Sequence, residues 1–304
     1  MLPGVGDRTA SGMLWVLLSL CVLVSPLFGP PGSARASWIF DADAGFVYET
    51  NVGLAQKARD VKSDGALSTA LSTGLAIPLD DRSTASITGD LSGNLHVELP
   101  GLSNLGVGVT TAFRHKFGLG PSAPWVRVFG SGARFEFDDS IRDGFRYRVG
   151  AGAGMRLGNR LDVRVDYSFE EYEADHGKVL ARGVPGDVFD TTAHTYAGRL
   201  DFFYNETLSL FAGYALRDGD VVSTTRRNAQ IFAASSALTA DRAFGPGFIA
   251  YKIDAIVHIL TFGMSFAMTS KSSLNIGYER QIGLGRGGLD YYNDVFRAGL
   301  LFSY

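Results

Sequence analysis

The sequence predicts an all-β protein: a transmembrane, antiparallel, up-and-down β-barrel of about 12 strands, with short turns at one end and longer loops at the other. Three observations support this fold class. Apolar and polar residues alternate with period two over segments long enough to cross a bilayer, the connections between these segments alternate in length, and the chain begins with a secretion signal.

Residues 1–36 form a predicted signal peptide that is cleaved from the mature chain. An apolar run covers 13–28 and is too short for a comfortable membrane-spanning helix, and the sequence ARA at 34–36 follows it as a cleavage site. Cys21 raises the alternative of a lipid-anchored N-terminus. Leu20, however, occupies the position where such a site needs a small residue, so we expect cleavage without lipidation.

The clearest alternation lies in the middle of the predicted barrel domain, 37–304. Apolar residues occupy every odd position of 145–157, and arginine or glycine occupies every even position. After a turn at 158–160, the segment 161–170 repeats the pattern with charged residues and serine at the even positions. Two such segments predict a long antiparallel hairpin. A soluble sandwich is the alternative, but strands of this length suit a barrel with its apolar face in lipid and its polar face toward a lumen.

Twelve segments of this kind follow one another along the chain, and the two longest connections, 175–190 and 222–248, fall at the same end. The segment 249–269 fits least well, because its apolar residues change from odd to even positions near Ile259. We expect either a β-bulge there or a missed boundary. The predicted strands are 38–51, 64–79, 83–98, 104–118, 125–138, 144–158, 160–174, 191–205, 207–221, 249–269, 272–283 and 290–304.

The end of the chain, RAGLLFSY at 297–304, resembles the C-terminal assembly signal of Gram-negative outer-membrane β-barrel proteins. Arg297, Gly299, Phe302 and Tyr304 carry the resemblance, with a polar residue, a glycine and a terminal aromatic in the order typical of that signal. The resemblance implies a place in the cell outer membrane, with periplasmic turns and external loops. It also implies two partners, the outer-membrane lipid and the barrel-assembly machinery.

The charged side chains that parity places on the lumen face are the candidate functional residues. They nearly balance in sign, so either a structural network of cross-strand pairs or a selectivity lining for a polar solute explains them. From the first strand they include Asp41, Asp43 and Glu49. The others are Arg134, Glu136, Arg146, Arg148, Arg156, Asp162, Arg164, Asp166, Glu170, Arg199, Asp201, Arg217, Glu279 and Arg297.

The sequence contains no recognisable catalytic constellation, metal-ligand spacing or cofactor motif. His194 has lipid-facing parity near the outer rim, but its neighbours lack the patterns of known outer-membrane acyl hydrolases, so we expect an interfacial histidine. A formal net charge of −3 does not indicate a nucleic-acid partner. We therefore expect a non-enzymatic small channel or passive transporter for polar solutes. A structural or partner-binding barrel without a pore is the alternative, and a lipid-modifying enzyme is the third possibility.

Overall fold

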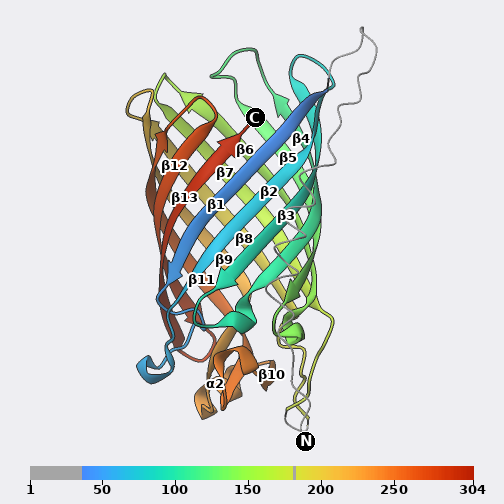
Figure 1. Cartoon of the computed structure of the whole chain (residues 1–304), viewed down its shortest axis with the longest axis vertical. Helices are drawn as coiled ribbons and strands as arrows, with labels where there is room; N and C mark the ends of the chain where they lie inside the picture. The colour runs from blue at the N-terminus through green and yellow to red at the C-terminus, as the bar shows by residue number, and fades with distance from the viewer. Residues whose placement is uncertain (1–35, 181–182) are drawn as a thin grey trace, which may run out of the picture. The chain divides into compact units, whose positions relative to one another are not determined.

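The computed structural model describes residues 36–180 and 183–304 (Figure 1). The predicted signal peptide therefore lies almost entirely outside the described residues, and its cleavage stays a prediction. Within the described ranges, no helix has both the length and the apolar character of a membrane span.

Twelve long antiparallel strands form a closed barrel, as the sequence predicted. Strands that are neighbours in the chain are neighbours in the wall, β11 follows β9, and β13 pairs with β1 to close the ring. The strands are β1 (Ser37–Glu49), β2 (Asp64–Pro78), β3 (Ser83–His96), β4 (Asn104–Lys116), β5 (Trp125–Phe137), β6 (Gly144–Leu157), β7 (Leu161–Ala174), β8 (Thr191–Phe203), β9 (Leu208–Arg226), β11 (Phe248–Ala267), β12 (Ser272–Gly285) and β13 (Leu289–Ser303).

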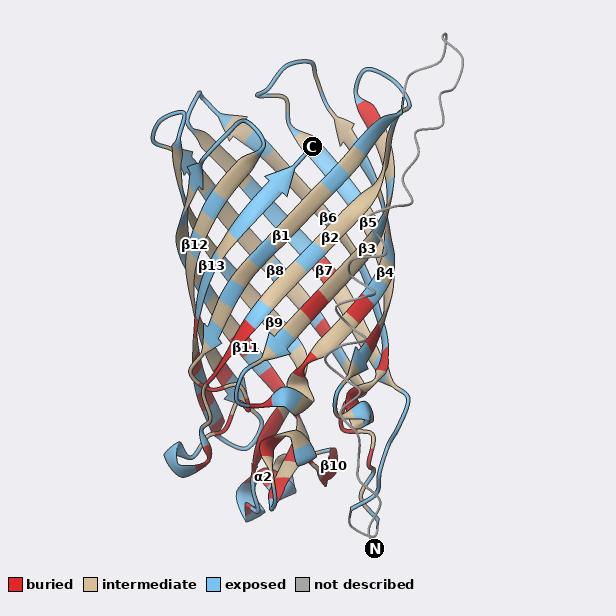
Figure 2. Ribbon diagram, viewed as in Figure 1, coloured by how far each residue is buried: buried red, intermediate tan, exposed pale blue. Residues whose placement is uncertain are grey.

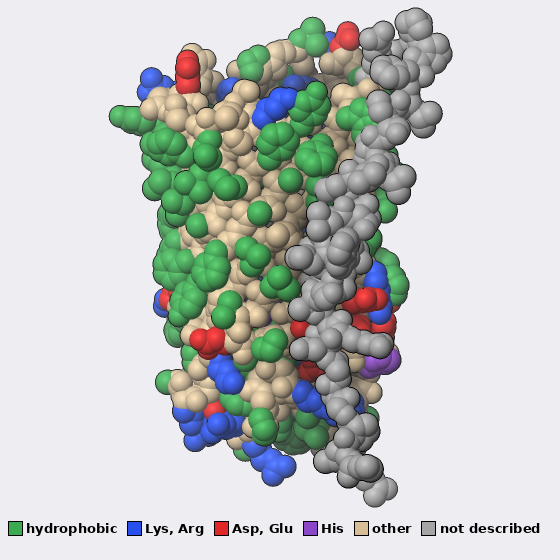
Figure 3. Space-filling model, in the orientation of Figure 1, with side chains coloured by type: hydrophobic (Ala, Val, Ile, Leu, Met, Phe, Trp, Pro, Cys, Tyr) green, Lys and Arg blue, Asp and Glu red, His purple; other side chains and the backbone are tan. Residues whose placement is uncertain are grey.

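The alternation in sequence explains the two faces of the wall. Val149 and Val165, for example, point outward and are 54% and 57% exposed, whereas Arg148 and Asp166 line a cavity inside. Figure 3 shows hydrophobic side chains spread over the outer wall and charged side chains gathered toward its ends. An apolar outside around a polar inside is the arrangement that a bilayer requires of a β-barrel.

The two ends of the barrel differ in their connections. The short turns 79–82, 158–160, 204–207 and 268–271 and the somewhat longer 117–124 lie at the end that holds the C-terminus, here called the turn end. The opposite end, the loop end, holds 50–63, 97–103, 138–143, 175–190, 227–247 and 286–288. The longest connections therefore lie at one end, as predicted.

Strand β11 corrects one expectation, because it contains no bulge and no boundary near Ile259. Its register is continuous against both β9 and β12. The strand extends beyond the barrel rim, where its inward residues Ile253, Ala255 and Val257 are buried beneath the loops. Nearer the turn end, its apolar residues are instead the outward ones, such as Phe262. The change of parity thus marks a change of surroundings along one regular strand.

The loop end is covered by a folded cap made of the segments 50–63, 97–103, 138–143, 175–180, 183–190 and 227–247. Figure 2 shows that the buried residues gather here rather than along the barrel. The cap contains short elements that the sequence did not predict: a helix, α2 (Ala229–Ala234), a four-residue strand, β10 (Ala237–Ala240), which pairs with β11, and four 3-10 turns, η2 (Ala58–Asp60), η3 (Pro100–Leu102), η4 (Ser140–Arg142) and η5 (Arg242–Phe244).

Long-range contacts hold the cap together. The N–H of Thr224 donates to the carbonyl of Gly53 at 2.7 Å, and the Ser223 hydroxyl donates to the carbonyl of Leu54 at 2.9 Å. The connection between β1 and β2 therefore reaches β9, which lies far around the ring. Ile231 of α2 and Leu238 of β10 are buried against inward residues of β9, β11 and β13. The cap thus has an apolar core of its own at the mouth of the lumen.

Candidate functional site

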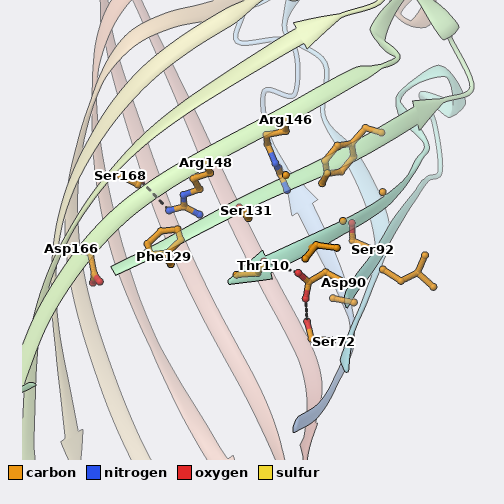
Figure 4. Close-up of a pocket in the computed structure, with 18 of the residues that line it drawn as sticks. Ser72, Asp90, Ser92, Thr110, Phe129, Ser131, Arg146, Arg148, Asp166 and Ser168 are labelled. Atoms are coloured by element: carbon orange, nitrogen blue, oxygen red, sulfur yellow. Dashed lines mark hydrogen bonds between the residues drawn. The ribbon is translucent and has the colours of Figure 1, made fainter. Parts of the chain in front are cut away.

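The barrel encloses a polar lumen, and one cavity in it has a volume of about 550 Å³. We call this cavity the lumen alcove; Figure 4 shows side chains from β2 to β7 that converge on it. A volume of this size is typical of small-molecule sites, which span about 300–1,000 Å³. The labelled lining residues are Ser72, Asp90, Ser92, Thr110, Phe129, Ser131, Arg146, Arg148, Asp166 and Ser168.

Strand pairing places all but two of the sequence-predicted lumen charges on the inner face. Asp41, Asp43 and Glu49 of the first strand share this face. The others there are Arg146, Arg148, Arg156, Asp162, Arg164, Asp166, Glu170, Arg199, Asp201, Arg217, Glu279 and Arg297.

The expectation that Arg134 and Glu136 line the lumen is wrong. Arg134 is paired in register with the outward residue Phe145 and stacks on its ring, so it faces outward, and Glu136 shares its parity. At the rim Arg134 donates to both carboxylate oxygens of Asp175, at 2.7 and 2.6 Å. The prediction assumed that Phe135 faces outward, which placed Arg134 and Glu136 on the lumen face. Phe135 instead points into the otherwise polar lumen.

Four charged residues that line the lumen were not predicted from the sequence: Asp90 on β3, Arg114 and Lys116 on β4, and Arg127 on β5. Serine and glycine occupy both faces of β3, so the apolar signal there is weak. On β4 a signal was present, because Val107, Val109 and Phe113 alternate with the positions of the two cations. For Arg127 a signal was present: two valines flank it in sequence, and both face lipid.

Four arginines follow one another over the inner face of β4, β5 and β6, and we call them the arginine ladder. They are Arg114, Arg127, Arg148 and Arg146. Arg114 is directly opposite Arg127 in the register of β4 and β5. Among the described residues, none of the four forms an ion pair with a carboxylate; Arg148 donates only to the Ser168 hydroxyl, at 3.1 Å. Their charge is therefore available to a solute.

Aromatic rings hold the ladder in place. The guanidinium carbons of Arg127 and Arg148 lie 5.3 and 5.5 Å from the ring centre of Phe129, on which both stack. Arg146 lies 4.4 Å from the ring centre of Phe135, and Arg114 stacks in the same way on Trp125 at 4.6 Å. Stacking on a ring face stabilises a guanidinium by about 0.5–1 kcal/mol at exposed sites and leaves its N–H edge free to donate.

Other lumen arginines are neutralised by neighbouring carboxylates. Arg156 donates to both oxygens of Asp162, at 2.7 and 3.0 Å, and Arg199 is paired with Asp201 at 2.7 Å. Arg164 approaches Asp166 less closely, at 3.8 Å. These pairs agree with the first alternative, a structural network, because they link residues of neighbouring strands or of one strand within the barrel wall.

Unpaired negative charge lies elsewhere on the wall. Every charged inner-face residue of β4, β5 and β6 is a cation, whereas β1 contributes only carboxylates. On β12 the carboxylate of Glu279 has one cation nearby, Arg297 at 4.0 Å. The charges that the sequence suggests thus balance in sum. On the inner face, β4, β5 and β6 carry only cations and β1 only carboxylates, whereas β7 carries both signs beside β6.

Two carboxylates line the lumen alcove together with arginines of the ladder: Asp166, which Arg164 approaches, and Asp90. Its Oδ1 accepts from the hydroxyls of Ser72 at 2.6 Å and Thr88 at 3.2 Å, and its Oδ2 accepts from Thr110 at 2.7 Å (Figure 4). No ion pair to Asp90 is found among the described residues. Hydroxyl groups alone orient this carboxylate.

The structure does not assemble a catalytic or metal site around His194. Its Nδ1 shares a hydrogen bond with the Tyr167 hydroxyl at 3.0 Å on the outer face, and its ring packs against Phe169. Over residues 36–180 and 183–304, no group of three or more potential ligand side chains is placed to hold a metal ion.

Comparison with known proteins supports the fold. No family model and no curated protein sequence matches the chain. An outer membrane channel from Pseudomonas putida F1 is similar in structure, with a TM-score of 0.52 and 12% identity over 92% of this chain and 100% of that one. The NanC porin gives 0.45 and 12% over 86% and 98%, and the KdgM porin with disordered oligogalacturonate gives 0.44 and 11% over 87% and 99%. The chain thus has the closed, antiparallel, 12-stranded architecture of an outer-membrane β-barrel.

Proposed function

We propose that the protein is an outer-membrane channel for small polar solutes and that it prefers anions. The observation that carries the proposal is the arginine ladder, a series of guanidinium groups without carboxylate partners on one wall of the lumen. An anion can exchange its water for the N–H groups of one arginine and then of the next. Paired lumen charges would not offer this, because their donors are already used.

The strength of such contacts suits passage rather than capture. An arginine about 4 Å from a unit negative charge attracts it by about 1 kcal/mol in bulk water and by about 4 kcal/mol at an effective dielectric constant of about 20. Conduction requires sites that are favourable enough to enter and weak enough to leave. Several arginines in series, all in contact with lumen water, satisfy both conditions.

The placement in the membrane is part of the proposal. The turn end is periplasmic and the loop end external, and the barrel-assembly machinery recognises the last strand through Arg297, Gly299, Phe302 and Tyr304. Phe302 belongs to the outward parity of β13 and packs edge-on against Phe40, where it meets outer-membrane lipid. Arg297 points into the lumen from the same strand.

The external opening involves the cap. A cavity of about 360 Å³ lies between the cap and the inner wall, and it is lined by His96, Arg142, Tyr172 and Thr224 among others. The cap segments therefore line the path between this cavity and the loop end.

The test is single-channel recording of the purified barrel in planar bilayers under a potassium chloride gradient. We expect discrete openings and a reversal potential of the sign that chloride permeation gives. The double variant Arg127→Gln/Arg148→Gln should shift that potential toward zero, and the matched control Arg134→Gln, on the outer face, should leave it unchanged. Absence of openings at every voltage would contradict the channel and favour a structural or partner-binding barrel, and cation selectivity would contradict the anion preference.

A further inference from the structure

We propose that the lumen alcove is a binding site for small zwitterionic solutes, molecules that carry an ammonium group and a carboxylate a few bonds apart. The proposal rests on the proposed function, since it names the solute class of that channel. In it, Asp90 receives the ammonium group, and Arg146 and Arg148 receive the carboxylate. All three side chains line the same cavity of about 550 Å³.

The carboxylate of Asp90 has room for one more donor. An ionised carboxylate offers about four lone-pair sites, and the hydroxyls of Ser72, Thr88 and Thr110 fill three of them. Because all three donors are neutral, they orient the carboxylate without cancelling its charge. An ammonium group that occupies the fourth site makes a charge-assisted hydrogen bond, which is about twice as strong as a neutral one.

Strand register sets the distance between the two poles. Asp90 pairs with Gly108, Gly108 with Ala133, and Ala133 with Arg146, so Asp90 and Arg146 lie level with each other three strands apart. At about 4.8 Å between neighbouring strands, their Cα atoms are separated by about 14 Å along the wall. Both side chains line the same cavity, so one solute that fills it faces both charges.

Small residues line the inner wall between Asp90 and Arg146. Gly106, Gly108, Ser131 and Ala133 lie between Asp90 and the ladder on the inner face. A Cβ added at Gly108 would lie 2.7 Å from the Cβ of Ala133 and 2.8 Å from a backbone oxygen, so a side chain does not fit there without a shift of the strand. The space above these residues therefore stays open for a solute.

Separated charges also explain which solutes are favoured. A simple anion is attracted by the arginines of the ladder and repelled by Asp90. A simple cation is attracted by Asp90 and repelled by the arginines. A zwitterion gains at both poles, and discrimination of this kind needs the repulsive element as much as the attractive one. In a purely structural network Asp90 would have a cation partner, as Asp162 does, whereas its partners are hydroxyl groups.

The test measures binding rather than conduction, so it can fail independently of the channel. Calorimetric titration of the full barrel in detergent uses three probes of similar length: γ-aminobutyrate, butyrate and butylammonium. We expect γ-aminobutyrate to bind at least about tenfold more tightly than either single-charge probe. Asp90→Asn should lower its affinity to that of butyrate, and the matched control Asp43→Asn, which removes a lumen carboxylate outside the alcove, should not change it.

Each other outcome overturns the proposal. Butyrate that binds as tightly as γ-aminobutyrate would mean an anion site without a second pole. Equal affinity in wild type and Asp90→Asn would exclude Asp90 as the ammonium partner, and heat-modifiable gel migration shows that the variant is folded. Absence of binding of all three probes to a barrel that conducts would refute the site and leave the channel intact. The wild-type comparison alone decides the matter if Asp90→Asn does not fold.

Discussion

Replacing Arg142 by methionine is expected to loosen the cap at neutral pH, and lowering the pH is expected to tighten it again. Arg142, in η4, donates to both carboxylate oxygens of Asp241, at 2.7 and 3.3 Å. The side chain of Asp241 is 0% exposed and that of Arg142 is 10% exposed. The pair joins the 138–143 and 227–247 segments, and the Thr224 hydroxyl of β9 donates to the same carboxylate at 2.7 Å.

The magnitude follows from leaving a buried charge without its partner. Removing one member of a buried ion pair costs about 3–5 kcal/mol, whereas replacing both members by apolar residues is often neutral. At about 1.4 kcal/mol per factor of ten, the single variant should raise the open fraction of the cap by at least about 100-fold. The double variant Arg142→Met/Asp241→Leu should return it to near the wild-type value.

The pH dependence has a definite sign. Burial already raises the pKa of Asp241 above its ordinary value, and the charge of Arg142 opposes that rise. Without Arg142 the pKa rises further. A carboxyl group whose pKa is higher in the closed cap than in the open one takes up its proton more readily in the closed cap. The variant cap therefore loses stability as the pH rises through that pKa and regains it as the pH falls.

Hydrogen exchange followed by mass spectrometry, on the barrel in lipid nanodiscs, measures the opening directly. Peptides that cover 222–248 should exchange much faster in the single variant at pH 7 than in wild type or the double variant. Arg286→Gln is the control, because its pair with Asp254 is exposed and such pairs contribute about 0–1 kcal/mol. Equal exchange in single and double variants, or no recovery of the single variant at low pH, would refute the reasoning.

Three further predictions concern the cap, the rim and the ladder. Ile253→Ala should cost about 2–5 kcal/mol by removing a buried side chain of the cap core, and hydrogen exchange should speed up in the cap peptides while the barrel strands stay protected. The hydrogen bond from Arg134 lowers the pKa of Asp175, so Arg134→Gln should move the carboxyl titration of Asp175, followed by NMR, upward toward its ordinary value; an unchanged titration would show that the pair does not form in solution. Arg127 and Arg148 both stack on the Phe129 ring, so Phe129→Leu should release both guanidinium groups and change the reversal potential. A reversal potential equal to that of wild type would show that stacking does not position them.

The barrel could be predicted from the sequence because lipid imposes one rule on every strand. Outward residues must be apolar over the width of the bilayer, so alternation reveals strand number, order and approximate length without knowledge of any contact. The rule weakens where side chains on both faces are small, as on β3. It also fails where an aromatic residue enters the lumen, as Phe135 does beneath Arg146.

The site could be predicted only in part for the same reason. Parity alone indicates which face a charge occupies, but not whether it has a partner. Arg148 and Arg156 each lie opposite a carboxylate of β7 in the register, and only Arg156 forms an ion pair with it. The cap lay beyond prediction because its contacts join distant segments, as Gly53 and Thr224 do. The helix α2 and the strand β10 are too short for a periodic pattern of apolar residues to identify them.

Thiol accessibility along β5 tests the central claim, that Arg127 lines a water-filled lumen while its neighbour faces lipid. The only cysteine of the sequence, Cys21, lies in the predicted signal peptide, so a single cysteine can be placed at will. An anionic, membrane-impermeant thiosulfonate is applied to outer membranes that carry Arg127→Cys or Val128→Cys. The lumen account predicts rapid labelling at position 127 and protection at position 128; labelling at 128 with protection at 127 would contradict it.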